Sequence, residues 1–456
     1  MTDLARVVAA VLLLSAAPAY AQSDGDMGDM SNMPGMNMPD AQPPSNAQPQ
    51  SNTQNNDEMP GMDMQDMQNM EMPSTGILGS YPMTRDASGT SWQPDAASHH
   101  ALHFMDGGWS FMAHMQLFGL YDTQSGPRGG DKFFLAGMAM GAARYDFSDG
   151  DIVNLRAMLS PDPFMGKRGY PLLLATGETA NGTAPLIDRQ HPHDLFMELS
   201  ATYSHRFSQD NGVFLYLGYP GEPALGPPAF MHRASAVDIP DAPITHHWLD
   251  STHITFGVVT AGFVHDDWKL EVSQFTGREP DQHRFNFDPV KLDSTSARLS
   301  WNPDSNWSLQ VSAGHLKSPE QLDPATNETR YTASATYVLP LGKDGSFAAT
   351  AGWGLKHLSD GTNLNGAFLE EEYKPDELWT VIARAEWLQN NELLPDGATH
   401  RAGELTLGAI HDWQIADHLK MGLGGLYTFD FLSSALKPAY DGNPHGAMLF
   451  VRALAD

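Results

Sequence analysis

The chain has 456 residues, a formal net charge of −29 and no cysteine. The lack of cysteine excludes disulfide bonds and thiolate metal sites, so any soft metal ligand has to be a methionine thioether. The strong negative charge argues against nucleic acid as a partner, because phosphate would be repelled. It is compatible with attraction of cations, and equally with an acidic, solvated surface.

Residues 1–21 have the features of a secretory signal peptide. Arg6 supplies a short positive region, residues 7–17 form an apolar stretch, and Ala19, Tyr20 and Ala21 make a cleavage site of the small-x-small type. We therefore expect export and cleavage after Ala21. No later segment reaches the roughly 18–20 consecutive apolar residues of a transmembrane helix, so no helical anchor is predicted.

Residues 22–75 form a low-complexity segment rich in methionine that contains no Lys, Arg, His, Phe, Trp or Tyr. Such a composition cannot bury a core, so we expect disorder in isolation. Clustered thioethers on a flexible chain can enclose a soft cation, and a copper ion, Cu(I), is predicted here. The alternative is a solvated spacer whose methionines scavenge oxidants. The predicted ligands are Met27, Met30, Met33, Met36, Met38, Met59, Met62, Met64, Met67, Met70 and Met72.

Residues 76–107 form a transition segment. It ends with His99, His100, His103 and Met105, a spacing that could bind a metal. An equally good interpretation is the entry to a strand, with interfacial aromatic residues beside it.

From residue 108 to 456, apolar and polar residues alternate with the period of two that is typical of β-strands. Aromatic residues often stand at the ends of the apolar faces, as in the girdles of outer-membrane barrels, and the opposite faces are small and polar. We predict an all-β, antiparallel outer-membrane β-barrel of about 16 strands, preceded by the disordered Met-rich segment. A soluble barrel or sandwich is the alternative.

The predicted connections alternate between short turns and long loops, and the long ones include 161–194, 220–252 and 277–292. Many outer-membrane barrels end on an aromatic residue, whereas this chain ends on Asp456. The last predicted segment is 445–454, and two interpretations of this ending are open: the final strand stops at Phe450, or the assembly signal is weak.

The loop 161–194 ends in a cluster of titratable residues that includes His191, His193 and Asp194. In extended backbone, residues two apart point the same way, so the two histidines are predicted to share one side as metal ligands, with Asp194 beside them. The alternative is a structural knot in which Arg189 and Asp194 tie the loop into the lumen. A closed site needs further ligands, for which the next long loop offers Met231, His232, His246, His247 and His253.

Several methionines of the early strands fall on the predicted lumen side. If that register is right, they form a thioether-lined path, whereas a shift of one residue would turn them toward lipid. The residues are Met112, His114, Met138, Met140 and Met158.

The layout resembles that of bacterial outer-membrane copper-resistance proteins of the B type. The resemblance lies in the signal peptide, in the acidic Met-rich runs 26–30 and 59–64, and in the barrel that follows. The run 186–199 is also similar to a poorly characterised family of exported barrel-like proteins. The Met-rich segment lacks the histidine that copper-resistance segments often contain, which favours Cu(I) over Cu(II).

We therefore predict an outer-membrane barrel that binds copper, with roles in tolerance or efflux. Its implied partners are outer-membrane lipid, metal ions and periplasmic copper proteins. The alternative is a general porin or structural barrel in which the Met-rich segment is a spacer. No phosphate-binding loop, HExxH or GxSxG motif is present, and no enzymatic activity is predicted.

Overall fold

The computed structural model describes residues 75–98, 101–147 and 150–455. The predicted signal peptide, the eleven predicted Met ligands of residues 22–75, and His99 and His100 lie outside the described residues. The predictions for them, disorder included, stay predictions.

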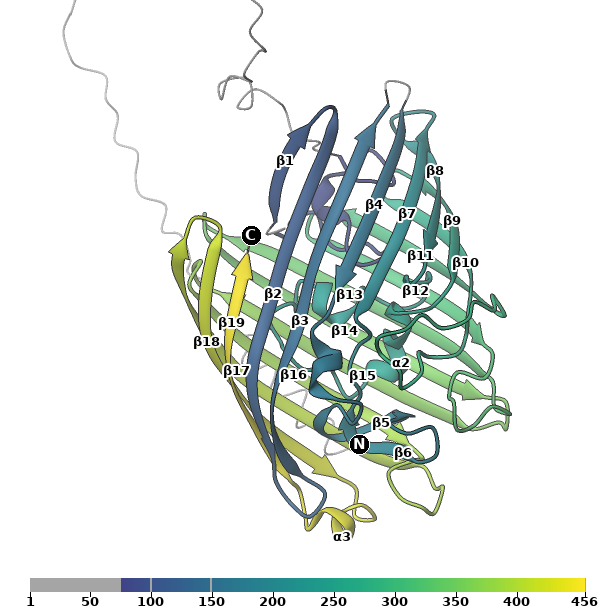
Figure 1. Cartoon of the computed structure of the whole chain (residues 1–456), viewed down its shortest axis with the longest axis vertical. Coiled ribbons are helices and arrows are strands. Elements are labelled where there is room, and N and C mark those ends of the chain that lie inside the picture. The colour runs from purple at the N-terminus through teal and green to yellow at the C-terminus, as the bar shows by residue number, and fades with distance from the viewer. Residues whose placement is uncertain (1–74, 99–100, 148–149, 456) are drawn as a thin grey trace, which may run out of the picture. The chain divides into compact units, whose positions relative to one another are not determined.

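Sixteen antiparallel strands of the described chain form a closed barrel, as the sequence pattern predicts (Figure 1). Each strand pairs with the next along the barrel, and the last pairs with the first. The barrel strands are β2 (Trp109–Gln124), β3 (Gly130–Asp146), β4 (Asp151–Leu159), β7 (Phe196–Arg206), β8 (Asn211–Gly218), β9 (Val258–His265), β10 (Trp268–Phe275), β11 (Ser294–Asp304), β12 (Trp307–Leu316), β13 (Glu328–Leu341), β14 (Gly345–Leu358), β15 (Asn363–Lys374), β16 (Trp379–Asn390), β17 (His400–Ala416), β18 (Leu419–Leu432) and β19 (His445–Ala455).

Three details differ from the sequence-based expectation. Of the alternating residues 254–258, residues 254–257 are not part of a strand: Ile254 and Phe256 are buried in a loop, and β9 begins only at Val258. The last strand runs past Phe450 to Ala455. A short extra strand, β1 (Leu102–Asp106), pairs with residues 109–113 at the start of β2. On the same edge of β2, residues 115–124 pair with β19.

The two ends of the barrel differ in their connections. At one end, which we call the short-turn end, the links are two to four residues long, and both the start of β2 and the end of β19 lie there. The opposite end carries the long loops 160–195, 219–257 and 276–293, close to the predicted ranges. We call it the long-loop end.

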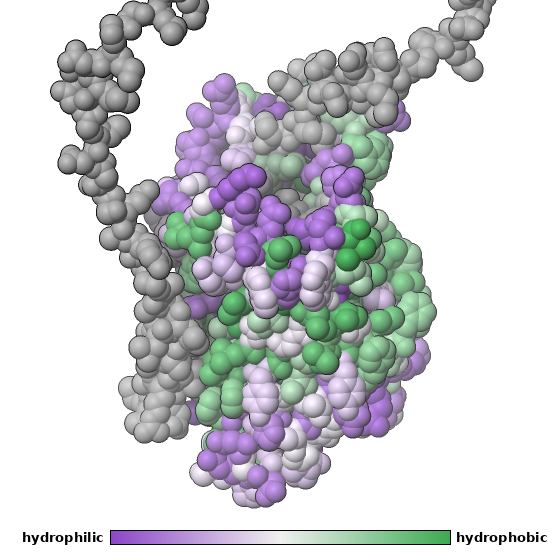
Figure 2. Space-filling model, turned by 90° about the vertical axis from the view of Figure 1, so that its left-hand side faces the viewer, coloured by the Kyte–Doolittle hydropathy of each residue, from purple (hydrophilic) through white to green (hydrophobic). Residues whose placement is uncertain are grey.

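The predicted division of faces is observed. Along β2, Gln116 and Asp122 are buried toward the lumen, whereas Tyr121 and its neighbour Phe133 on β3 are 47% and 69% exposed. In Figure 2, hydrophobic residues gather across the middle of the visible face, with hydrophilic ones toward both ends. This is the pattern of a barrel whose outside meets lipid. Among the described residues, no helix is long and apolar enough to span a membrane.

Three segments of the chain fold inside the barrel (Figure 1). The entry segment, residues 75–98, contains the short helix η2 (Met83–Arg85). The loop 160–195 contributes η3 (Asp162–Met165) and the hairpin of β5 (Tyr170–Thr179) with β6 (Pro185–Gln190). The plug loop, residues 219–257, contains η4 (Phe230–His232), α2 (His246–Leu249) and η5 (Ser251–His253). A last short helix, α3 (Lys437–Tyr440), lies in the loop before β19.

Candidate metal-binding site in the lumen

The plug loop is held to the barrel wall by charged side chains that are fully buried. Arg233 of the plug loop forms ion pairs with Glu370 of β15 and, at 3.0 Å, with Asp250 of its own loop. Asp241 accepts a hydrogen bond of 3.1 Å from Arg384 of β16. Buried ion pairs of this kind need both partners, because removal of one leaves an uncompensated charge. These ion pairs therefore hold the plug loop in one position, because the loss of either partner would cost several kcal/mol of stability.

Two glycines let the plug loop approach the wall closely. A Cβ atom on Gly354 of β14 would lie 2.2 Å from the backbone oxygen of Trp248, and one on Gly366 of β15 would lie 2.8 Å from the Trp248 ring. The indole Nε1 donates a hydrogen bond of 3.1 Å to the carbonyl of Leu364. The wall is thus shaped to receive α2.

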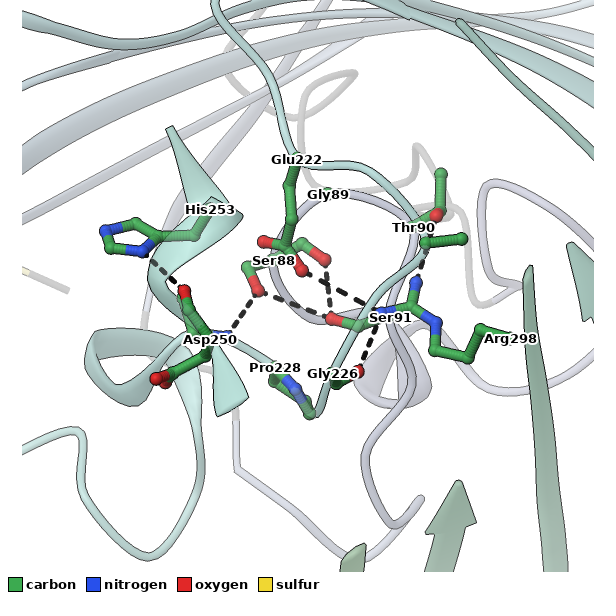
Figure 3. Close-up of polar contacts among 12 residues, drawn as sticks. Ser88, Gly89, Thr90, Ser91, Glu222, Gly226, Pro228, Asp250, His253 and Arg298 are labelled. Carbon is green, nitrogen blue, oxygen red and sulfur yellow. Dashed lines mark hydrogen bonds and ion pairs between the residues drawn. The ribbon is translucent and has the colours of Figure 1, made fainter. Parts of the chain in front are cut away.

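Figure 3 shows one of the places where the entry segment, the plug loop and the wall meet. Ser88 Oγ accepts a hydrogen bond of 2.9 Å from the backbone N–H of Ala229 in the plug loop. Arg298 of β11 donates at 3.1 Å to the carbonyl of Gly226 and at 3.2 Å to Thr90 Oγ1. Arg298 therefore connects the barrel wall to both the plug loop and the entry segment.

A cavity of about 170 Å³ lies between the entry segment, the first strands and η4. Five methionines and three histidines line it, together with Asp86, Gln93 and Asn154. Two arginines also line it, but Arg144 is paired with Asp146 at 2.7 Å and Arg156 with Glu198 at 3.2 Å. We call it the Met cavity, and the Met and His residues that line it are Met83, Met112, Met138, Met140, Met231, His103, His114 and His232.

The predicted lumen-side register of the early strands is the observed one. The predicted residues on β2 and β3 line the Met cavity, and Met158 on β4 is buried at its edge. The thioether Sδ of Met158 lies 3.3 Å from Nε2 of His232. A tetrahedral ion with nitrogen at about 2.0 Å and sulfur at about 2.3 Å holds such atoms about 3.5 Å apart. The observed spacing is therefore one that a shared metal ion can span.

A second, smaller cavity of about 30 Å³ adjoins the Met cavity and shares Met138 and Met231 with it. It is also lined by His193, whose Nδ1 lies 2.9 Å from Asp162 Oδ2. We call it the inner cavity. Met138 and Met231 therefore lie at the boundary between the two cavities.

Five histidines of the two long loops come together beyond the inner cavity. Ring centroids are 5.2 Å apart for His193 and His253, 5.1 Å for His246 and His253, and 5.9 Å for His191 and His247. Burial lowers the pKa of His191, His246 and His253, so these rings favour the neutral form. The sequence prediction that loop 220–252 supplies imidazoles near His191 and His193 agrees with this arrangement.

The predicted roles of individual residues in this cluster differ from what is observed. Asp194 pairs with Arg284 at 3.1 Å rather than with a histidine, and burial raises its pKa to about 6. His193 contacts Asp162, and His191 contacts Glu178 at 3.1 Å. His246 contacts Asp250 at 2.8 Å, and His247 contacts Glu279 at 3.2 Å. Among the described residues, no group of three or more His, Asp or Glu side chains is placed to hold a metal ion.

Two features of the site escape the sequence pattern. Asp162 follows β4 in a loop whose fold no periodicity predicts, and Met83 enters the Met cavity from the entry segment. The sequence predicts His232 as a partner of His191 and His193, yet it contacts Met158 in the Met cavity. The predicted knot around Arg189 is observed only in part, since Arg189 donates to the backbone carbonyl of Arg168 at 2.8 Å.

No protein-family model and no curated protein matches the chain. Solved structures with a similar fold include OmpF of Salmonella typhi in complex with daunomycin, at 10% identity and a TM-score of 0.50, covering 77% of this chain and 100% of that one. DcaP, an outer-membrane channel of Acinetobacter baumannii, has 10% identity and a TM-score of 0.43, covering 76% and 98%. An anion-selective porin from Comamonas acidovorans has 10% identity and a TM-score of 0.41, covering 75% and 99%. At such identities the likeness to OmpF shows the fold alone: a closed 16-stranded antiparallel β-barrel of the outer-membrane type.

Proposed function

We propose that this protein is an outer-membrane barrel that takes up soft metal ions, Cu(I) in the first place, into a closed lumen. The observation that carries the proposal is the Met cavity, in which five thioethers and three imidazoles line one space. Thioether and imidazole are the ligands that suit Cu(I), and no thiol is present to compete.

The position of the Met cavity supports this function. It is lined by Met83 and Gln93 of the entry segment and by Ser110 at the start of β2, which belong to the short-turn end. In outer-membrane barrels the short turns face the periplasm. In the sequence, the Met-rich tract directly precedes the entry segment, which supplies Met83 to the Met cavity.

A cell-based experiment tests the proposal. We expect the Met112→Leu/Met140→Leu variant to lower copper and silver tolerance of a sensitive host relative to the unchanged chain, because leucine keeps the volume and removes the thioether. The matched control is Met115→Leu/Met421→Leu, in strand positions on the other register; Met421 is 37% exposed on the outside. Equal tolerance of both variants and the unchanged chain, at equal barrel levels, would contradict the proposal.

A solute channel is the second candidate function. Its support is the barrel wall, which presents buried Arg, Lys, Asp and Glu side chains to the lumen, and the similarity of the fold to OmpF. The plug loop fills that lumen, so passage of a solute requires displacement of the plug loop. Planar-bilayer conductance separates the two functions: a channel conducts without metal, whereas the metal-binding barrel stays closed.

A further inference from the structure

The inner cavity has the size and donor set of a site for one ion. Its volume of about 30 Å³ exceeds the roughly 10–15 Å³ that a single water-sized particle needs. The rest of its lining includes the apolar Phe118 and Phe230 and the polar side chains of Gln116, Asp162 and Tyr170. All three possible ligands are buried, with exposed fractions of 2%, 9% and 8%.

His193 has the hydrogen-bond arrangement of a metal ligand. Its Nδ1 lies 2.9 Å from Asp162 Oδ2, and its backbone N–H donates to the same oxygen at 3.3 Å. A ring that donates its Nδ1 proton to a carboxylate keeps the lone pair on Nε2, which is how carboxylates orient metal-binding histidines. Within the described chain, that buried Nε2 has no hydrogen-bond partner. An unmet acceptor costs free energy unless something binds it.

We propose that Met138 Sδ, Met231 Sδ and His193 Nε2 form an inner binding site for one monovalent soft ion, Cu(I) or Ag(I). The inference rests on the proposed function, since the ion would reach this site from the Met cavity, past Met138 and Met231, which line both cavities. Two thioethers and one imidazole are uncharged ligands. A monovalent ion carries the smallest charge that this buried site has to accept, and the carboxylate of Asp162 in the lining is available to balance it.

The plug loop gives this site a second role. Met231 comes from the plug loop, Met138 from the wall strand β3, and His193 from the other long loop. An ion bound by all three joins segments that are otherwise connected through hydrogen bonds and ion pairs. Metal binding at the inner site is thus expected to tighten the plug loop against the wall.

The test uses the full chain in detergent, under anaerobic conditions, with the eleven methionines of the tract replaced by leucine. Cu(I) is titrated against a competing chelator, and copper X-ray absorption spectra are recorded at one equivalent. We expect tight binding with an imidazole scatterer, which His193→Gln removes. Asp162→Asn should weaken binding by about 10–100-fold while the imidazole scatterer stays. His315→Gln, at an exposed position of β12, is the matched control and should change neither readout.

The outcomes separate this inference from the proposed function. Imidazole scattering that persists in His193→Gln at unchanged affinity would overturn the inner site but leave the Met cavity as the binding place. Loss of Cu(I) binding in Met112→Leu/Met140→Leu without any effect of His193→Gln would also overturn the inner site and leave the Met cavity as the binding place. Absence of any Cu(I) binding by the lumen would overturn both. Heat-modifiable migration on gels shows for each variant that the barrel is folded.

Discussion

At the residue scale, the lumen is held together by charges that the sequence shows only as isolated Arg, Asp and Glu residues. Arg233 is fully buried and shared between Glu370 and Asp250. Its guanidinium also donates to the carbonyl of Pro228 at 2.8 Å. A planar guanidinium with several donors can satisfy three acceptors at once, which an ammonium group cannot do in the same geometry.

We therefore expect Arg233→Met to destabilise the plug loop by about 3–5 kcal/mol, because Glu370 and Asp250 become unpaired buried charges. Hydrogen exchange of residues 219–257 measures the loss of protection. The control is Arg401→Met, since Arg401 is an exposed residue of β17. A plug loop in Arg233→Met as protected as in the unchanged chain would contradict the assigned role of this ion pair.

The contact between the plug loop and the entry segment should depend on pH through Glu222. Burial raises the pKa of this carboxyl from 4.5 to about 7, against the opposing effect of Arg298, whose Nη1 lies 3.9 Å away. Below pH 4.5 the carboxyl is protonated in both the folded and the unfolded protein. Between pH 4.5 and 7 only the unfolded form ionises freely, so the contact loses stability as the pH rises, by up to about 3 kcal/mol.

Hydrogen exchange of residues 86–93 between pH 5 and pH 8, corrected for intrinsic exchange, checks this dependence. We expect protection to fall as the pH rises in the unchanged chain and to stay flat in Glu222→Gln, which keeps the shape and cannot ionise. Protection that rises with pH in the unchanged chain would show that the sign is wrong.

At the element scale, the seat of α2 is made by glycines of the wall. Alternation in β14 and β15 predicts the strands correctly, but nothing in the pattern shows that Gly354 and Gly366 face a helix. The same holds for residues 254–257, whose alternation resembles a strand although the segment is buried in the plug loop. Short apolar alternation is ambiguous once a barrel contains a plug, because both environments bury apolar residues.

Replacement of Gly354 by alanine should displace the plug loop, since the added Cβ would lie 2.2 Å from the backbone oxygen of Trp248. We expect a larger ion conductance in planar bilayers than for the unchanged chain. Gly141→Ala is the matched control, because the nearest atom to its Cβ is 3.9 Å away. Equal conductance of the two variants would mean that the wall and the plug loop adjust without opening the lumen.

At the scale of the whole molecule, the class of fold and the division into inner and outer faces could be predicted from the sequence. A period of two with aromatic residues at strand ends is typical of membrane-spanning barrels, and the lumen-side placement of Met112, His114, Met138 and Met140 follows from register alone. Which histidine meets which carboxylate could not be predicted. The partner of His193 is Asp162, and their contact depends on how a loop of 36 residues folds back into the lumen.

Two of the long loops, 160–195 and 219–257, lie inside the barrel rather than outside it (Figure 1). In sequence they could be external loops of an open porin, and the buried state of residues 219–257 follows only from the folded structure. We propose that a barrel whose lumen is filled by its own chain and lined by thioethers on one side serves selective binding rather than diffusion.

The most direct test of metal binding in the lumen is anomalous diffraction from crystals of the full chain soaked with Cu(I) or Ag(I) under anaerobic conditions. We predict anomalous peaks inside the barrel, in the Met cavity near Met158 and His232 and in the inner cavity beside His193. Peaks confined to the outer surface or to the loops of the long-loop end, with both cavities empty of metal, would contradict a metal-binding lumen and favour the solute channel.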